Sequence, residues 1–99
     1  MNKVLIQIWE ESIREVGTRP DGCSLHIDNQ ERDRYISSVY EKRTDSKVPD
    51  EYDRVVGYPI DALIEDVLFK KLKSEKTIRI EEHSLRNLIG MEEIVVRDE

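Results

Sequence analysis

The chain of 99 residues has a single cysteine and lacks any long run of hydrophobic residues. One cysteine cannot form a disulfide within the chain, which is typical of proteins in a reducing compartment. No apolar stretch approaches the roughly 20 residues of a transmembrane helix, and the N-terminus lacks the basic and then apolar segments of a secretion signal. We therefore expect a cytoplasmic protein that does not enter a membrane.

Basic residues are also scarce, with 16 Lys and Arg against 22 Asp and Glu and a formal net charge of −6. Nucleic-acid-binding domains normally carry a basic surface that displaces phosphate counterions, so we expect no direct binding to nucleic acid. The acidic side chains favour a basic partner surface, or they only keep the protein soluble, as dispersed charge does in many small proteins.

Short segments with strand or helix periodicity follow one another along the chain. They predict strands at 3–9, 23–27, 55–60, 77–80 and 91–96, and helices at 28–43, 63–73 and 82–89. The order β-β-α-β-α-β-α-β predicts one α+β domain over residues 1–99. We expect a small mixed or antiparallel sheet of about five strands, with two to three helices mainly on one face.

Residues 19–28 hold most of the local signals. Pro20, Asp21 and Gly22 are typical of a turn, because proline fixes φ and glycine adopts left-handed conformations. Asp28 precedes Glu31 by three residues, which predicts a capped helix start. The turn and the cap together predict a hairpin that leads into a helix.

The segment Arg19-Pro20-Asp21-Gly22-Cys23-Ser24-Leu25-His26 is followed, after the expected helix, by Val48-Pro49-Asp50-Glu51-Tyr52. This pattern, with the Gln7-to-Ser12 strand before it, resembles small uncharacterised proteins of bacteriophages and bacterial mobile elements. The resemblance is strongest over residues 4–54. It implies a viral context and no particular chemistry.

A catalytic site is not expected in the segment that resembles the phage proteins. Ser24, His26 and Asp28 share one face of the expected strand, but alternate strand residues lie about 7 Å apart, too far for the direct hydrogen bonds of a triad. Cys23 lies on the other face with apolar neighbours and is expected in the core. Metal ligands at the usual spacings and a phosphate-binding glycine loop are absent as well, so we expect no metal or cofactor.

Binding is the more plausible role for the polar residues of this segment. A forked guanidinium together with neutral donors and acceptors suits a small anionic or nucleotide-like ligand, or the carboxylate of a partner. The expected ligand- or partner-binding residues are Arg19, Ser24, His26, Tyr52 and Arg54. In the alternative interpretation, Arg19 pairs with a nearby acid and His26 bonds a backbone group.

Two further surfaces are candidates for contacts with other proteins. Asp50, Glu51 and Asp53 form an acidic cluster that would suit a basic partner. Trp9 and Leu5 lie on the face of the first strand opposite its other apolar residues. If helices cover only one face of the sheet, these two side chains form an exposed apolar interface, such as that of a homo-oligomer. If a helix covers both faces, Trp9 is part of the core.

The sequence therefore predicts a non-enzymatic binding protein, in keeping with a phage-type inhibitor of a host defence system. Such an inhibitor would either cover a host protein or sequester a small nucleotide-like ligand. Two alternatives remain: a small hydrolase or transferase that uses His26 as a general base, and a structural subunit of an oligomer.

Overall fold

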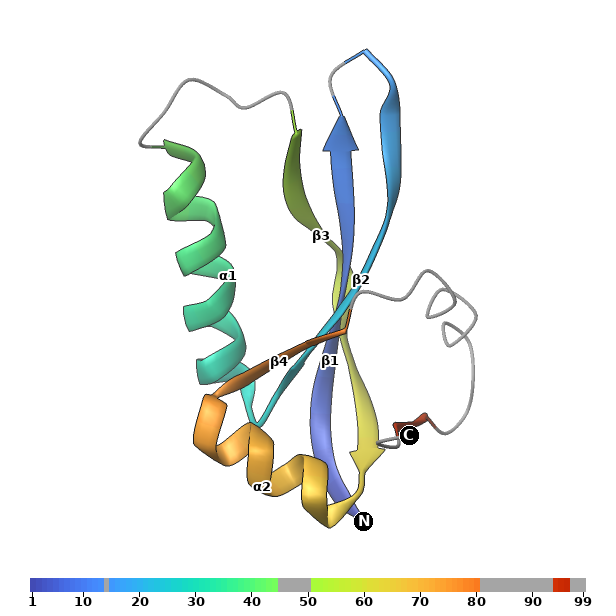
Figure 1. Ribbon diagram of the computed structural model, residues 1–99, viewed down its shortest axis with the longest axis vertical. Coiled ribbons are helices and arrows are strands. Elements are labelled where there is room, and N and C mark those ends of the chain that lie inside the picture. The colour runs from blue at the N-terminus through green and yellow to red at the C-terminus, as the bar shows by residue number, and fades with distance from the viewer. Residues whose placement is uncertain (14, 45–50, 81–93, 97–99) are drawn as a thin grey trace.

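The computed structural model describes residues 1–13, 15–44, 51–80 and 94–96, with the side chains of 42–44 and 51–52 excepted. Figure 1 shows the elements, whose bounds are β1 Asn2–Ile13, β2 Gly17–His26, α1 Asn29–Thr44, β3 Glu51–Ile64, α2 Asp66–Glu75, β4 Thr77–Ile80 and β5 Val95–Val96. The protein has an α+β fold, as the sequence predicts. The expected helix at 82–89 lies outside the described residues.

The strands form one mixed sheet in the order β4-β2-β1-β3-β5. All neighbouring strands are antiparallel except β3 and β5, which are parallel. β1 lies at the centre, as its apolar residues on both faces indicate. β3 is much longer than the expected strand at 55–60, and α2 begins three residues after the expected start at residue 63.

The hairpin turn between β1 and β2 includes Glu15 and Val16, so the predicted turn at 20–22 is wrong. β2 continues through 20–22 as a strand, and Asp21 and Gly22 together face Trp9 of β1. Two residues opposite one make a β-bulge, and Gly22 has a φ of 71°, in the left-handed region that glycine adopts at low cost. The turn-forming residues therefore bend the strand without ending it.

A larger bulge interrupts β3, where the three residues 57–59 face only Gln7 of β1. The Gln7 side chain is fully buried, and its Nε2 donates to the carbonyl oxygens of Val56 and Gly57 at 3.3 and 3.2 Å. These bonds tie the Gln7 side chain to the backbone of the bulge. The bulge holds Tyr58 out in solvent, where it is 92% exposed.

One face of the sheet is apolar and packs against α2. Alternate residues of the strands form this core together with two leucines of the helix, because side chains two residues apart in a strand point to the same face. Its buried members are Val4, Ile6, Ile8, Cys23, Leu25, Ala62, Ile64, Leu68, Leu72, Ile78 and Ile94. The predicted burial of Cys23 is confirmed.

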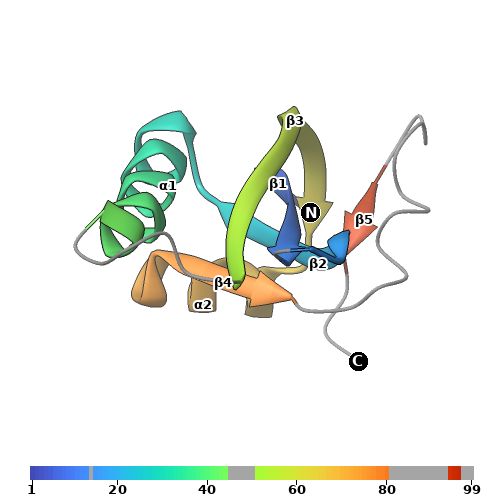
Figure 2. The same cartoon turned by 90° about the horizontal axis from the view of Figure 1, so that it is seen from above.

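The other face of the sheet is covered by α1, so the expectation of helices mainly on one face is wrong. Trp9 is buried on this face, and its ring makes edge contacts with Tyr35 and Tyr40 of α1, at centroid distances of 5.7 and 6.4 Å. Figure 2 shows α1 beside the strands and α2 beneath them. The proposed interface of Trp9 and Leu5 is therefore not an exposed patch, since Trp9 belongs to the core and Leu5 is half-buried.

Neither described helix has the length and apolar character needed to cross a lipid bilayer.

Candidate functional site: a groove between the two helices

Ser24 and His26 lie in direct contact, contrary to the distance expected from their strand spacing. Ser24 Oγ is 2.6 Å from His26 Nε2. The imidazole ring is long enough to bridge the spacing between the two backbone positions. Trp9 Nε1 donates to the same Ser24 Oγ at 2.8 Å. All three side chains are buried under α1.

The imidazole of His26 is neutral at physiological pH. Burial, followed by the positive charge of Arg32, lowers the pKa of His26 to about 4. Trp9 can only donate to the serine oxygen, whereas the Ser24 hydroxyl, with one proton and two lone pairs, donates to Nε2 or accepts from it according to the tautomer of the ring. Nδ1 has no hydrogen-bond partner among the described residues. The bond to Ser24, in place of one to the backbone, is the interaction that orients the ring.

Ser24 and His26 have the contact of a nucleophile and its base, yet both side chains are enclosed beneath α1. Both residues are fully buried, and the Trp9 indole already occupies the serine oxygen. A general base must reach the proton that it abstracts. This arrangement favours packing of the helix on the sheet as the role of the pair.

The two arginines of the predicted binding set lie far from His26 and are engaged with acids. Arg19 Nη2 lies 2.7 Å from Glu11 Oε2, and Arg54 Nε lies 3.0 Å from Glu10 Oε1. Glu10 and Glu11 are consecutive in β1, so the two ion pairs are on opposite faces of the sheet. The interpretation in which Arg19 pairs with an acid is confirmed, and the predicted set does not form one site.

The acidic partner surface is also divided. Asp50 lies outside the described residues, and the same is true of the side chains of Glu51 and Tyr52, whose backbones pair with β1. Asp53 is not a free surface charge. Burial, followed by a hydrogen bond with the carboxyl of Asp21, raises the pKa of Asp53 to about 7, and its Oδ2 lies 3.5 Å from Arg79 Nη2.

Arg79 of β4, which sequence reasoning missed, links side chains on the face of the sheet that α1 covers. Its guanidinium stacks over the Trp9 ring at 4.8 Å, and Nη2 contacts the Asp21 carboxylate at 3.0 Å. Nη1 donates to the Tyr35 hydroxyl at 3.3 Å. The signal was present, because Arg79 alternates with Ile78 and Ile80 in a short strand and must face the side opposite to them.

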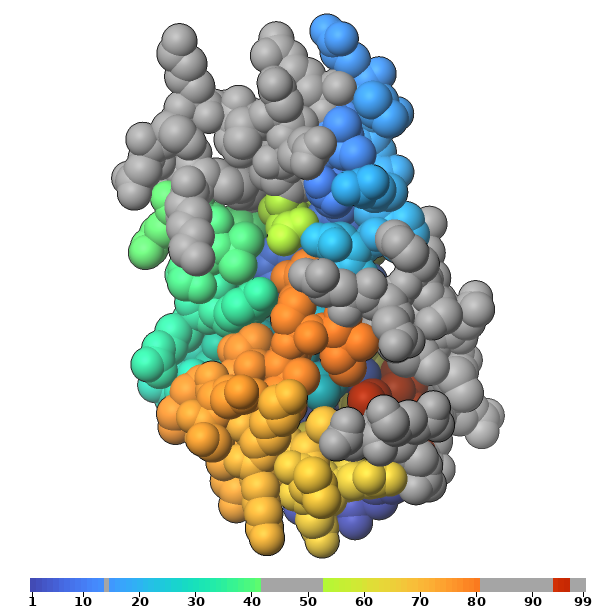
Figure 3. All heavy atoms as spheres, viewed as in Figure 1, coloured from blue at the N-terminus to red at the C-terminus, as the bar shows by residue number. Residues whose placement is uncertain are grey.

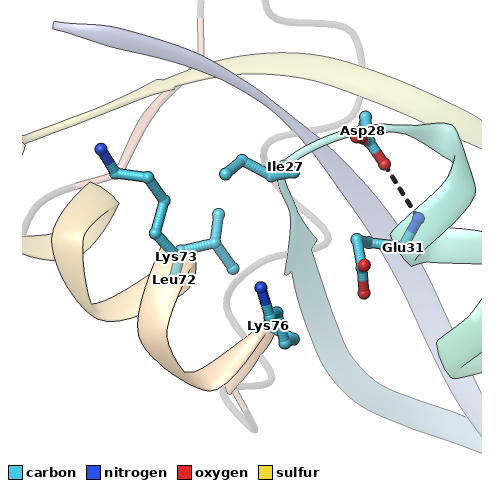
Figure 4. Close-up of a pocket in the computed structure, with 6 residues that line it drawn as sticks. All are labelled: Ile27, Asp28, Glu31, Leu72, Lys73 and Lys76. Carbon is cyan, nitrogen blue, oxygen red and sulfur yellow. Dashed lines mark hydrogen bonds between the residues drawn. The ribbon is translucent and has the colours of Figure 1, made fainter.

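A groove lies where the start of α1 meets the end of α2. Its volume is about 350 Å³, and its lining combines an apolar floor with charged rims: Ile27, Asp28, Glu31, Leu72, Lys73 and Lys76. Figure 4 shows Lys76 at the end of α2, between Leu72 and Glu31, and Lys73 extending away from α1. An adjoining hollow of about 200 Å³ shares Glu31 and Lys76 and adds residues of α1 and the start of β4: Arg34, Tyr35, Ser38 and Thr77.

The pairing of β2 with β4 creates this groove. His26, the last residue of β2, pairs with Thr77, the first residue of β4, in antiparallel orientation. Ile27 and Lys76 are consequently neighbours, although 48 positions separate them in the chain. In Figure 3 the atoms of α1, α2 and β4 meet on one side of the molecule. Sequence reasoning missed the groove because only this long-range register brings the two helix ends together.

Lys76 occupies a backbone position that normally favours glycine. It ends α2 with a φ of 72°, and its N–H donates to the Leu72 carbonyl oxygen at 2.8 Å. Glycine is the usual residue at a left-handed helix end because a Cβ atom is strained there. Among the described residues, no carboxylate pairs with the ammonium group of Lys76 or of Lys73.

The lining of the groove and hollow is more basic than the chain as a whole. It contains three cations, Arg34, Lys73 and Lys76, against the two carboxylates Asp28 and Glu31, within a chain of net charge −6. Ammonium groups beside an apolar floor suit the anionic group of a small ligand with an apolar body. No three His, Cys, Asp or Glu side chains of the described residues converge as a metal site requires.

Comparison with models of protein families, with curated protein sequences and with solved structures finds no match.

Proposed function

We propose that this protein binds a small nucleotide-like anion in the groove between α1 and α2 and does not transform it. The observation that carries the proposal is the position of Lys76, which lines the groove between the apolar side chain of Leu72 and the first turn of α1. The phage-like pattern of residues 19–26 implies a viral context, in which such binding would sequester a host signal. The protein would then act as an inhibitor by lowering the free concentration of that signal.

The dimensions and composition of the groove support a small ligand. Small-molecule sites commonly have volumes of about 300–1,000 Å³, an apolar lining and a few polar groups that set orientation. The groove lies at the lower end of this range, with Ile27 and Leu72 as the apolar surface. Lys76 is placed to contact a phosphate or carboxylate of a ligand that packs on these two side chains.

The strained backbone of Lys76 supports a role for its side chain. A residue with a Cβ atom in the left-handed region costs about 1 kcal/mol relative to glycine. Strain of this kind clusters at functional sites, where the side chain contributes something that glycine cannot. The ammonium group in the groove is that contribution in the present proposal.

The other modes of action have less support. Covering a basic partner surface relied on the cluster of Asp50, Glu51 and Asp53, and Asp53 is engaged with Asp21 and Arg79. Catalysis by His26 as a general base relied on an accessible imidazole, and this ring is buried against Ser24. An inhibitor that acts through sequestration depends on neither feature.

The test uses Lys76→Gly, which should separate binding from folding. Glycine fits a φ of 72° without strain, so we expect the melting temperature of the variant to be unchanged or higher. Isothermal titration calorimetry with AMP, GMP, CMP and UMP should show binding of at least one of them to the original protein. We expect Lys76→Gly to weaken that binding at least tenfold.

Lys70→Ala is the matched control, because Lys70 is exposed on the same helix and does not line the groove. It should bind the nucleotide as the original protein does. Absence of binding by all four mononucleotides, or equal binding by Lys76→Gly, would contradict the proposal.

A further inference from the structure

Glu31 is the carboxylate most enclosed by the groove. It lines both the groove and the adjoining hollow, and its side chain is only 20% exposed. Its backbone N–H is held by the Asp28 carboxylate at 2.9 Å, which fixes the first turn of α1. One guanidinium nitrogen, Arg34 Nη1, lies at 3.2 and 3.4 Å from its two oxygens.

A carboxylate beside Lys76 restricts which anions can occupy the groove. A ligand that carries only negative charge is attracted by the ammonium group of Lys76 and repelled by Glu31. A ligand with an anionic group at one end and N–H donors at the other satisfies both groups. The groove therefore suits a molecule with two chemically different ends.

Among nucleotides, the guanine base has the donors that match a carboxylate. Its N1–H and N2–H₂ groups lie side by side on one edge, so both oxygens of a carboxylate can accept at once, which makes a bidentate charge-assisted pair. Adenine and cytosine present an amino group next to a ring acceptor, and uracil presents one N–H between two carbonyl groups. Each of these bases places an acceptor against the carboxylate.

We propose that the groove selects guanine nucleotides, with Glu31 accepting from the base and Lys76 contacting the phosphate. This inference rests on the proposed function and names the ligand class of the same groove. Ile27 and Leu72 line the same groove on the side of Lys76 away from Glu31 and provide the apolar surface for the face of the base.

The first experiment compares GMP with AMP by isothermal titration calorimetry on the original protein. The two ligands share the phosphate and differ in the base, so their affinity ratio reports the base contact alone. We expect GMP to bind at least tenfold more tightly. A bidentate contact to a base typically gives discrimination of this order.

The second experiment uses Glu31→Gln, which keeps the size of the side chain and replaces one acceptor oxygen with an amino group. We expect its preference for GMP over AMP to fall to less than threefold, with AMP affinity retained. Glu75→Gln is the matched control, because Glu75 is an exposed carboxylate at the end of α2 that does not line the groove. This variant should lose one negative charge and keep the preference. Circular dichroism checks that both variants retain their helices.

The outcomes distinguish the two proposals. If none of AMP, GMP, CMP and UMP binds, both proposals are wrong, and if only CMP or UMP binds, the guanine assignment alone is wrong. If GMP and AMP bind equally, if AMP is preferred, or if Glu31→Gln keeps the full preference for GMP, the guanine assignment is wrong and the anion-binding groove stands. Weak binding of both ligands to Lys76→Gly, with the GMP preference retained, supports the assigned roles of Lys76 and Glu31.

Discussion

The two faces of the sheet are formed by alternate residues of the same strands and differ sharply in chemistry. The face under α2 is an apolar core in which Ile6 and Leu25 are fully buried. The face under α1 buries a glutamine, a serine and a histidine beside Trp9. The first is held mainly by removal of hydrocarbon from water, whereas the second depends on hydrogen bonds and ion pairs among its polar side chains.

The polar face is a network that joins all parts of the sheet under α1. Arg32 Nε of α1 donates to Gln7 Oε1 at 2.8 Å, and Gln7 in turn supports the bulge of β3. At the other end, Arg79 of β4 contacts Asp21 of β2 and Asp53 of β3. We therefore expect only the polar face to make a pH-dependent contribution to the free energy of unfolding, because its interacting side chains include titratable groups.

The largest expected effect is on the apolar face. Ile6→Ala leaves a cavity in the centre of the core and should lower the free energy of unfolding by about 2–5 kcal/mol. Because no titratable group is changed, the loss should be the same at pH 5 and pH 7 within the error of urea titrations. A loss that differs clearly between the two pH values would contradict the assignment of pH sensitivity to the other face.

His26→Gln tests the fully buried part of the polar face. The pKa of His26 is lowered from 6.5 to about 4, so the unfolded chain binds more protons between these values and stability rises with pH across this window. At pH 5 the charged form would be favoured in the unfolded chain only, at a cost to stability of about 1–2 kcal/mol relative to pH 7. The His26→Gln variant has no imidazole and therefore lacks this pH-dependent contribution to stability.

Urea unfolding of His26→Gln at pH 5 and 7 should therefore show a smaller gain in stability with pH than the original protein, or a loss. Because the readout is a difference between two pH values, a constant destabilisation by the substitution does not affect it. An unchanged pH dependence would show that His26 does not titrate as the buried ring predicts.

Asp53→Asn tests the partly exposed part of the polar face and should have the smallest effect on the free energy of unfolding. The pKa of Asp53 is raised from 3.8 to about 7, so the folded protein binds the extra proton and stability falls as pH rises across this window. Its side chain is 33% exposed, so solvent screening reduces the effect to below about 1 kcal/mol. Removing this group should steepen the gain in stability between pH 5 and 7, opposite to His26→Gln.

The same urea titrations measure this difference, with Asp61→Asn as the control because Asp61 forms only an exposed ion pair with Lys3. An unchanged pH dependence in Asp53→Asn would mean that the Asp53 carboxyl is already ionised in the folded protein between pH 5 and 7.

Local patterns in the sequence predicted the parts of the fold that depend on near neighbours. Alternation placed Cys23 and Leu25 on the buried side of their strand, and the spacing of Asp28 and Glu31 predicted the cap that begins α1. The turn at 20–22 was predicted wrongly from equally local signals. The same residues that form a turn also form a bulge when a neighbouring strand continues past them.

The sequence by itself determined the α+β class, the apolar face and the start of α1, because these depend on the two-residue period of strands and the capping of one turn. Tertiary structure alone decided the second covered face, the contact of Ser24 with His26, the partners of Arg79 and the groove at Lys76. Each of these depends on which strand pairs with which, and that choice is made by long-range packing across the whole sheet.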